Sequence, residues 1–151
     1  MKKTQRIDMV RRAVDDVERR KAEALAQSEQ RLHEAQIKLD ELENYRTAYL
    51  RDFNVRAQAG LAGAAARDYQ VFLGRLDEAL RHQGQILAQA EAQRGAELEN
   101  WRGAARRAAA VDTLAKHWRA EERLAEDKRE QQDTDESSLQ QWSRRSHVRV
   151  T

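Results

Sequence analysis

Histidines and carboxylates are the side chains of this sequence that most often catalyse reactions or bind metals. The four histidines, His33, His82, His117 and His147, are far apart, and none has a His or carboxylate partner in a recognised metal or catalytic motif. The phosphate-binding G-x-x-x-x-G-K-[ST] loop, the G-x-S-x-G turn and H-E-x-x-H are also absent, and there is no Cys for thiol chemistry. We therefore expect no catalytic residues, no metal site and no cofactor.

Aromatic side chains give the stronger signal, because three of them recur at helical spacing in the middle of the chain. Tyr45, Tyr49 and Phe72 belong to two stripes in which steps of four and three residues alternate. The stripes are Lys38, Leu42, Tyr45 and Tyr49, and Phe72, Leu76, Ala79 and Gln83. Two interpretations stay open: the stripes belong to an internal packing seam, or their aromatic side chains are exposed anchors for a partner.

The elements that position these stripes must be long helices. The 151 residues include no Pro, and 36% are charged while 5% are aromatic. Such a composition is typical of coiled coils and supplies too few large apolar side chains for a globular core. The formal charge of +2 is a small surplus over many mixed charges, which does not favour nucleic-acid binding.

The first predicted helix spans about residues 5–57 and carries an apolar seam. Its early members are Ile7, Val10, Val14 and Val17. After a phase slip around residues 21–24, interpreted as a stutter, the seam continues. The later members are Leu25, Leu32, Ala35, Leu39, Leu42, Tyr49 and Phe53, with Ser28 and Arg46 at polar seam positions.

A hairpin tip is predicted at about residues 58–64, where Gly60 can adopt the left-handed conformation that ends helices. The second helix is expected over about 65–130, followed by a frayed tail over about 131–151. Its predicted seam is Tyr69, Leu73, Leu76, Leu80, Leu87, Ala90, Leu98, Trp101, Ala105 and Ala108. The fold class is therefore all-α, a single domain formed by a long antiparallel two-helix coiled-coil hairpin.

Several segments resemble the flagellar export protein family FliJ over most of the chain. They are the run 42–49 (Leu-Glu-Asn-Tyr-Arg-Thr-Ala-Tyr), Ala59-Gly60 at the tip, the run 69–73 (Tyr-Gln-Val-Phe-Leu) with Leu76, Ala79 and Leu80, Asn100-Trp101-Arg102, and the run 124–128 (Leu-Ala-Glu-Asp-Lys). The resemblance implies a hairpin similar to the coiled-coil stalk of the rotary ATPase gamma subunit.

The resemblance also implies partners and surfaces. The partners would be the hexameric flagellar export ATPase, the cytoplasmic domain of the export gate and export chaperones. The gate-binding surface maps onto Leu42, Tyr45, Tyr49, Phe72, Leu76 and Ala79, whereas Lys38 and Gln83 depart from the family pattern. The ATPase contact would lie near the helix termini, at Arg11, Arg12, Arg19, Arg20 and Lys21.

The implied location is cytoplasmic, peripheral to the inner face of the cell membrane through these partners. The alternatives are a structural coiled coil that dimerises through its seam, the equivalent stalk of a virulence secretion system, and a nucleic-acid-binding coiled coil using Arg102, Arg106 and Arg107. A nucleic-acid binder would lose affinity steeply with salt, and partner pull-downs would separate the others.

Overall fold

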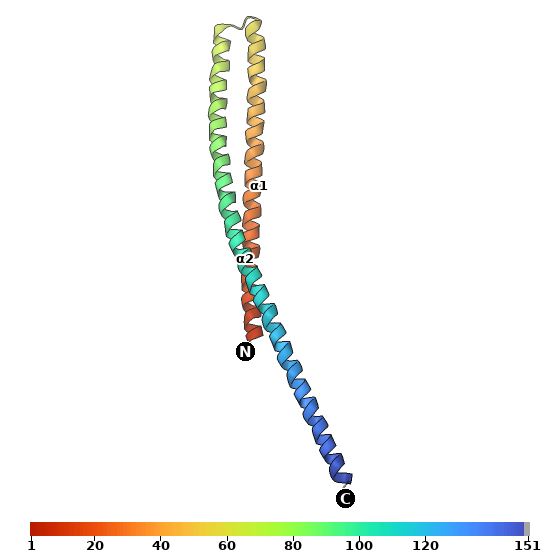
Figure 1. Ribbon diagram of the computed structural model, residues 1–151. Helices are drawn as coiled ribbons and strands as arrows, with labels where there is room; N and C mark the ends of the chain where they lie inside the picture. Colours follow the sequence, from red (N-terminus) through yellow and green to blue (C-terminus); the bar gives the residue numbers. More distant parts are fainter. Residues whose placement is uncertain (150–151) are drawn as a thin grey trace. The chain divides into compact units, whose positions relative to one another are not determined.

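The computed structural model describes residues 1–149 and contains two α-helices, α1 (Lys3–Gln58) and α2 (Gly63–Arg149) (Figure 1). The predicted all-α, two-helix hairpin is confirmed. The first turn of α1 is closed by Gln5, whose side-chain Oε1 accepts a hydrogen bond from the Lys2 backbone N–H at 3.2 Å. In return the Gln5 N–H donates to the Lys2 carbonyl at 3.1 Å, so two terminal backbone groups are satisfied.

The turn between the helices is four residues long and depends on one glycine. Gly60 has a φ of 93°, a backbone conformation that residues with a Cβ atom rarely adopt. Its N–H donates to the Ala57 carbonyl at 3.2 Å, and the Ala59 N–H donates to Val55 at 3.2 Å. Carbonyls in the last turn of α1 are therefore capped, and the turn lies within the residues 58–64 where the sequence predicts the tip.

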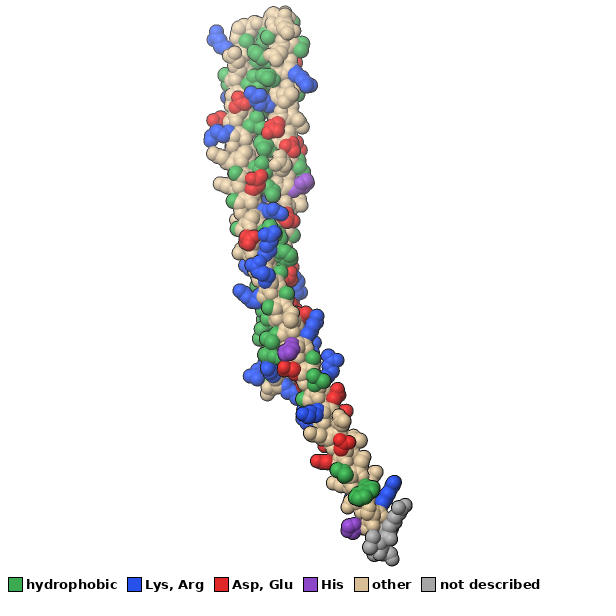
Figure 2. Space-filling model, viewed as in Figure 1, with side chains coloured by type: hydrophobic (Ala, Val, Ile, Leu, Met, Phe, Trp, Pro, Cys, Tyr) green, Lys and Arg blue, Asp and Glu red, His purple; other side chains and the backbone are tan. Residues whose placement is uncertain are grey.

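The chain divides into two compact units, each containing parts of both helices. The tip unit is Glu18–Ala104, and the terminal unit joins Met1–Val17 to the chain from Ala105 onward. In the tip unit α1 and α2 lie side by side and antiparallel, with apolar side chains gathered along their junction (Figure 2).

The buried side of α1 follows one uninterrupted seven-residue repeat, so the predicted stutter at 21–24 is wrong. Every seam residue is buried or half-buried, from Ile7 to Phe53. They are Ile7, Arg11, Val14, Glu18, Lys21, Leu25, Ser28, Leu32, Ala35, Leu39, Leu42, Arg46, Tyr49 and Phe53. Val10, predicted for this seam, is 48% exposed. The apolar residues predicted the wrong phase for the first part of the seam, because Arg11, Glu18 and Lys21 occupy positions that are usually apolar in a coiled coil.

The seam of α2 has the same regularity. Its members are Tyr69, Leu73, Leu76, Leu80, Gln83, Leu87, Ala90, Arg94, Glu97, Trp101, Ala104, Ala108, Val111, Ala115, Trp118 and Glu122. Glu97 and Ala104 belong to this repeat, and the predicted Leu98 and Ala105, one residue further along, are half-buried as well. Trp101 is half-buried as expected, and its indole N–H donates to Glu18 at 2.8 Å. A polar side chain of the α1 seam is thereby satisfied by an aromatic donor.

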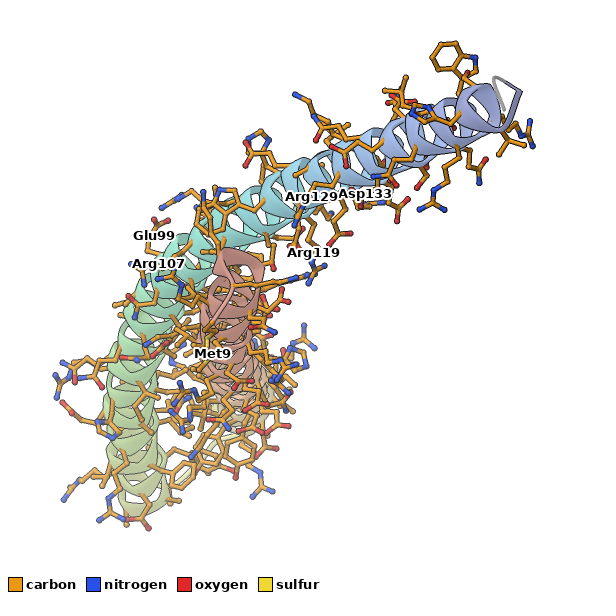
Figure 3. All side chains as sticks on the ribbon, turned by 90° about the horizontal axis from the view of Figure 1, so that it is seen from below. Met9, Glu99, Arg107, Arg119, Arg129 and Asp133 are labelled. Atoms are coloured by element: carbon orange, nitrogen blue, oxygen red, sulfur yellow. The ribbon has the colours of Figure 1, made fainter. Side chains whose placement is uncertain are left out.

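The second helix does not end near residue 130, which corrects the predicted tail of 131–151. No Gly or Pro follows Gly103, so nothing in the chain interrupts the main-chain hydrogen bonds. Past Arg129, which lines a pocket together with Lys2 and Lys3, α2 continues without α1 beside it, and Asp133 lies on this part of the helix (Figure 3). Residues 150 and 151 of the predicted tail lie outside the described residues.

Glycines inside α2 should be replaceable with a gain in stability. A Cβ built on Gly74 or Gly95 meets no atom within 4 Å, so Gly74→Ala and Gly95→Ala should each raise the free energy of unfolding by about 1 kcal/mol. Urea unfolding followed by circular dichroism measures this gain. Gly60→Ala is the matched control and should destabilise, because its positive φ strains an alanine. Equal effects at all three positions would contradict this account.

Candidate partner-binding surface

Five aromatic rings from both helices meet next to the tip, and we call them the aromatic cluster: Tyr45, Tyr49, Phe53, Tyr69 and Phe72. The ring centroids of Tyr49 and Phe72 are 4.5 Å apart, and those of Tyr49 and Tyr69 are 4.9 Å apart. Tyr45 meets Phe72 edge-on at 6.2 Å. These distances are typical of favourable aromatic pairs. The cluster therefore joins α1 to α2 and also holds the rings of both predicted stripes together.

A polar clamp closes the cluster on the tip side. The Tyr69 hydroxyl donates to Asp52 at 2.5 Å, and Arg56 lies 3.4 Å from the same carboxylate. The hydrogen bond from Tyr69, followed by the charge of Arg56, lowers the pKa of Asp52. The same bond raises the pKa of Tyr69, since the carboxylate favours the protonated phenol. At neutral pH the pair is therefore held as carboxylate and neutral phenol.

The two stripes lie together on one flank of the hairpin. With seam residues labelled a and d, the heptad places all eight stripe residues at d or at g, the position just before a. In an antiparallel pair the g residues of both helices border the same side of the seam. Tyr45 and Phe72 occupy g and make the ring contact above. The prediction that the stripes lie side by side is thus consistent with the aromatic contacts.

Burial divides the stripe residues into two groups. Tyr45 is 52% exposed and Lys38 is exposed, whereas Leu42, Tyr49, Phe72 and Ala79 are half-buried. Leu76 and Gln83 are only 6% and 3% exposed. The Gln83 side-chain amide donates to the Ala35 carbonyl across the seam at 3.1 Å. Direct contact of a partner with Leu76 or Gln83 does not fit this burial, so both residues belong to the packing beneath the surface.

The opposite flank, bordered by the e positions that follow d, is held by interhelical ion pairs. In the tip unit Arg46 pairs with Asp77 at 2.6 Å and Arg94 with Glu29 at 3.7 Å. Each pair joins a seam arginine to an e-position carboxylate of the other helix. The sequence pattern did not reveal these pairs, because it placed Arg46 at a polar seam position without a partner and gave Arg94 no place in the seam. The two flanks of the tip unit thus differ chemically, one aromatic and one ionic.

The terminal unit repeats the ionic flank. Arg11 pairs with Asp112 at 2.7 Å, and Arg119 pairs with Asp8 beside the N-terminal part of α1 (Figure 3). The hydrogen bond from Lys116, followed by the charges of Arg11 and Arg119, lowers the pKa of Asp112. The guanidinium of Arg11, one of the predicted ATPase contacts, is therefore already engaged in an ion pair within the hairpin.

The other predicted ATPase contacts differ in their surroundings. Arg12 is exposed in the terminal unit, whereas Arg19, Arg20 and Lys21 belong to the tip unit. Arg19 and Arg20 interact within the chain, and Lys21 is a half-buried seam residue. Arg12, Arg19 and Arg20 are all exposed, and of these three Arg12 is the one that lies in the terminal unit.

Tryptophans of the terminal unit occupy two different environments. Lys3 Nζ lies 4.0 Å from the centroid of the half-buried Trp118 ring, a cation–π contact that ties the start of α1 to α2. Trp142 is 70% exposed on the part of α2 that has no partner helix. Contact with a partner is thus sterically simpler at Trp142 than at Trp118.

Neither a metal site nor a membrane span is present among residues 1–149. No three His, Asp or Glu side chains within that range are grouped to hold a metal ion. Neither described helix has a window that is apolar enough to cross a membrane.

These features define a helical-hairpin protein whose candidate site is an exposed flank. The chain belongs to the FliJ family: the model of the flagellar FliJ protein matches residues 2–147. It is thus a component of flagellar protein export, and the resemblance drawn from the sequence is confirmed. Comparisons with curated proteins and with solved structures gave no match.

Proposed function

We propose that this chain is an adaptor of flagellar export that binds the cytoplasmic domain of the export gate through its aromatic flank. The contact residues are Tyr45, Tyr49 and Phe72, bordered by Lys38, Leu42 and Ala79. The observation that carries the proposal is the half-exposed Tyr45 ring, stacked in a cluster that continues into the seam. Tyrosine on a rigid support gives a large contact area at low entropic cost, as in binding hot spots.

The same proposal assigns the terminal unit to the export ATPase. Arg12 is exposed there, and Lys2 and Lys3 add positive charge near the start of α1. Bound to both partners, the hairpin would link the ATPase to the gate, stay peripheral to the membrane and carry export chaperones. Its mechanism is differential affinity for states of its partners, without chemistry of its own.

Binding to the purified gate domain tests the proposal. We expect Tyr45→Ala and Phe72→Ala each to weaken binding at least tenfold, because each removes a ring that is at least partly exposed on the aromatic flank. Val55→Ala is the control, since this side chain is 67% exposed on α1 outside the stripes. Calorimetric titration gives the affinities, and circular dichroism checks that helicity is equal.

Unchanged affinity in both aromatic variants would refute the gate proposal. It would favour the alternative in which the rings serve only to join α1 to α2. A loss in Val55→Ala as large as in the aromatic variants would show that binding does not depend on the flank.

A further inference from the structure

A groove continues the aromatic flank away from the tip, within the tip unit. It encloses about 530 Å³, and its lining includes Ser28, Ala35, Gln83 and Ala90 from the two seams. Because several seam side chains are small in this part of the hairpin, they fill the space between the helices only partly. Lys38 and Gln83, the residues of the two stripes that lie farthest from the tip, also line the groove, which therefore starts where the aromatic surface ends.

The rim of the groove combines an aliphatic side chain with two cations. Ile86 is 36% exposed on α2, and Arg31 and Lys38 are exposed on α1. All three occupy g positions, the same as Tyr45 and Phe72. Glu34 also lines the groove, but it accepts a hydrogen bond from Gln30 at 3.1 Å. Arg31 and Lys38 form no ion pair with any described residue, in contrast to the arginines of the ionic flank.

We infer that this flank groove, whose rim is formed by Arg31, Lys38 and Ile86 above the buried Ala35 and Gln83, binds an amphipathic helix of the gate domain with acidic side chains. The inference rests on the proposed function, since it extends the same partner along the same flank. Two cations without acidic partners complement carboxylates, and Ile86 with the small seam residues complements an aliphatic side chain.

A helix is the occupant that the backbone allows. Both walls of the groove are α-helices whose main-chain groups are hydrogen-bonded internally, so they offer no edge to an extended strand. A partner helix brings its own backbone bonds and presents side chains every three or four residues. It therefore packs on the d and g rows as a third helix, with ridges set into the groove.

The inference is tested by measuring how tightly variants of the groove bind the purified gate domain. We expect Ile86→Asp, and separately the double reversal Arg31→Glu with Lys38→Glu, to weaken binding about tenfold or more. The double reversal should also flatten the salt dependence of the affinity, because the attraction of opposite charges is screened by salt. The matched control is Arg51→Glu with Arg106→Glu, two exposed arginines at the outward f position, which should bind as wild type does.

Each outcome separates the two ideas. Weak binding of Tyr45→Ala with normal binding of every groove variant would overturn the groove and leave the gate proposal standing. Equal losses of affinity in the double reversal of the groove and in the control double reversal would show that only net charge matters. That result would also overturn the groove as a binding site. No binding by wild type would overturn both.

Discussion

Replacement of Leu76 by alanine should lower the free energy of unfolding by about 3 kcal/mol. Leu76 is the largest of the residues buried in the tip unit, at 6% exposure, and truncation leaves a cavity that two rigid helices cannot close fully. The matched control is Leu124→Ala, the same chemical change on a side chain that is 70% exposed, where we expect less than about 0.5 kcal/mol. Chemical denaturation of both variants gives the comparison.

The two leucines test whether the seam is the source of stability. Similar losses would mean that helix propensity, and not interhelical packing, holds the molecule together. A large loss at Leu76 alone would also explain any weaker gate binding of that variant as an effect on folding. Tyr45→Ala is then the better probe of contact, since it removes a ring that is half-exposed.

Ala115→Glu should open the terminal unit, with a cost of about 3 kcal/mol or more. Ala115 is fully buried, so a glutamate there must either displace the facing part of α1 or bury its charge. Hydrogen exchange of the amides of residues 7–14 should quicken at least tenfold, because the N-terminal turns of α1 lose their support. Amides of the tip unit should keep their protection.

The control for that experiment is Ala120→Glu, in the same helix and unit. Ala120 is exposed, so its replacement adds the same charge without entering the seam. Protection of residues 7–14 should then equal that of wild type. Equal exchange in the two variants would contradict the tight packing at Ala115.

The fold was predictable because its main determinants are local. The absence of Pro, the helical spacing of apolar residues and Gly60 predicted two helices joined by a tip, although α2 continues beyond its predicted end near residue 130. The seam phase near the N-terminus was not predictable from hydrophobicity. Hydrophobicity favours Val10 and Val17 as seam residues, whereas the seam of the structure contains Arg11 and Glu18. These two side chains acquire their partners, Asp112 and Trp101, only when the helices pair.

The candidate site was predictable in part. Spacing placed Tyr45 and Tyr49 on one stripe and Phe72 on a second stripe of the same spacing, and the structure brings the three rings together. The spacing of residues in the sequence did not reveal that Tyr69 and Phe53 complete the cluster, because the contact between these two rings depends on the interhelical register. Burial of Gln83 was equally hidden, since its bond to the Ala35 carbonyl joins residues 48 apart in sequence.

The order in which the hairpin folds follows from its tip. Asp52 and Tyr69 are separated by 17 residues, whereas Lys2 and Glu122 are separated by 120. Closing the longer loop first would cost about 2 kcal/mol more in chain entropy, on logarithmic scaling of loop closure. We therefore expect the aromatic contacts next to Gly60 to form first, and each further seam pair to add only a short length of chain, so that α1 and α2 pair progressively from the tip toward the termini.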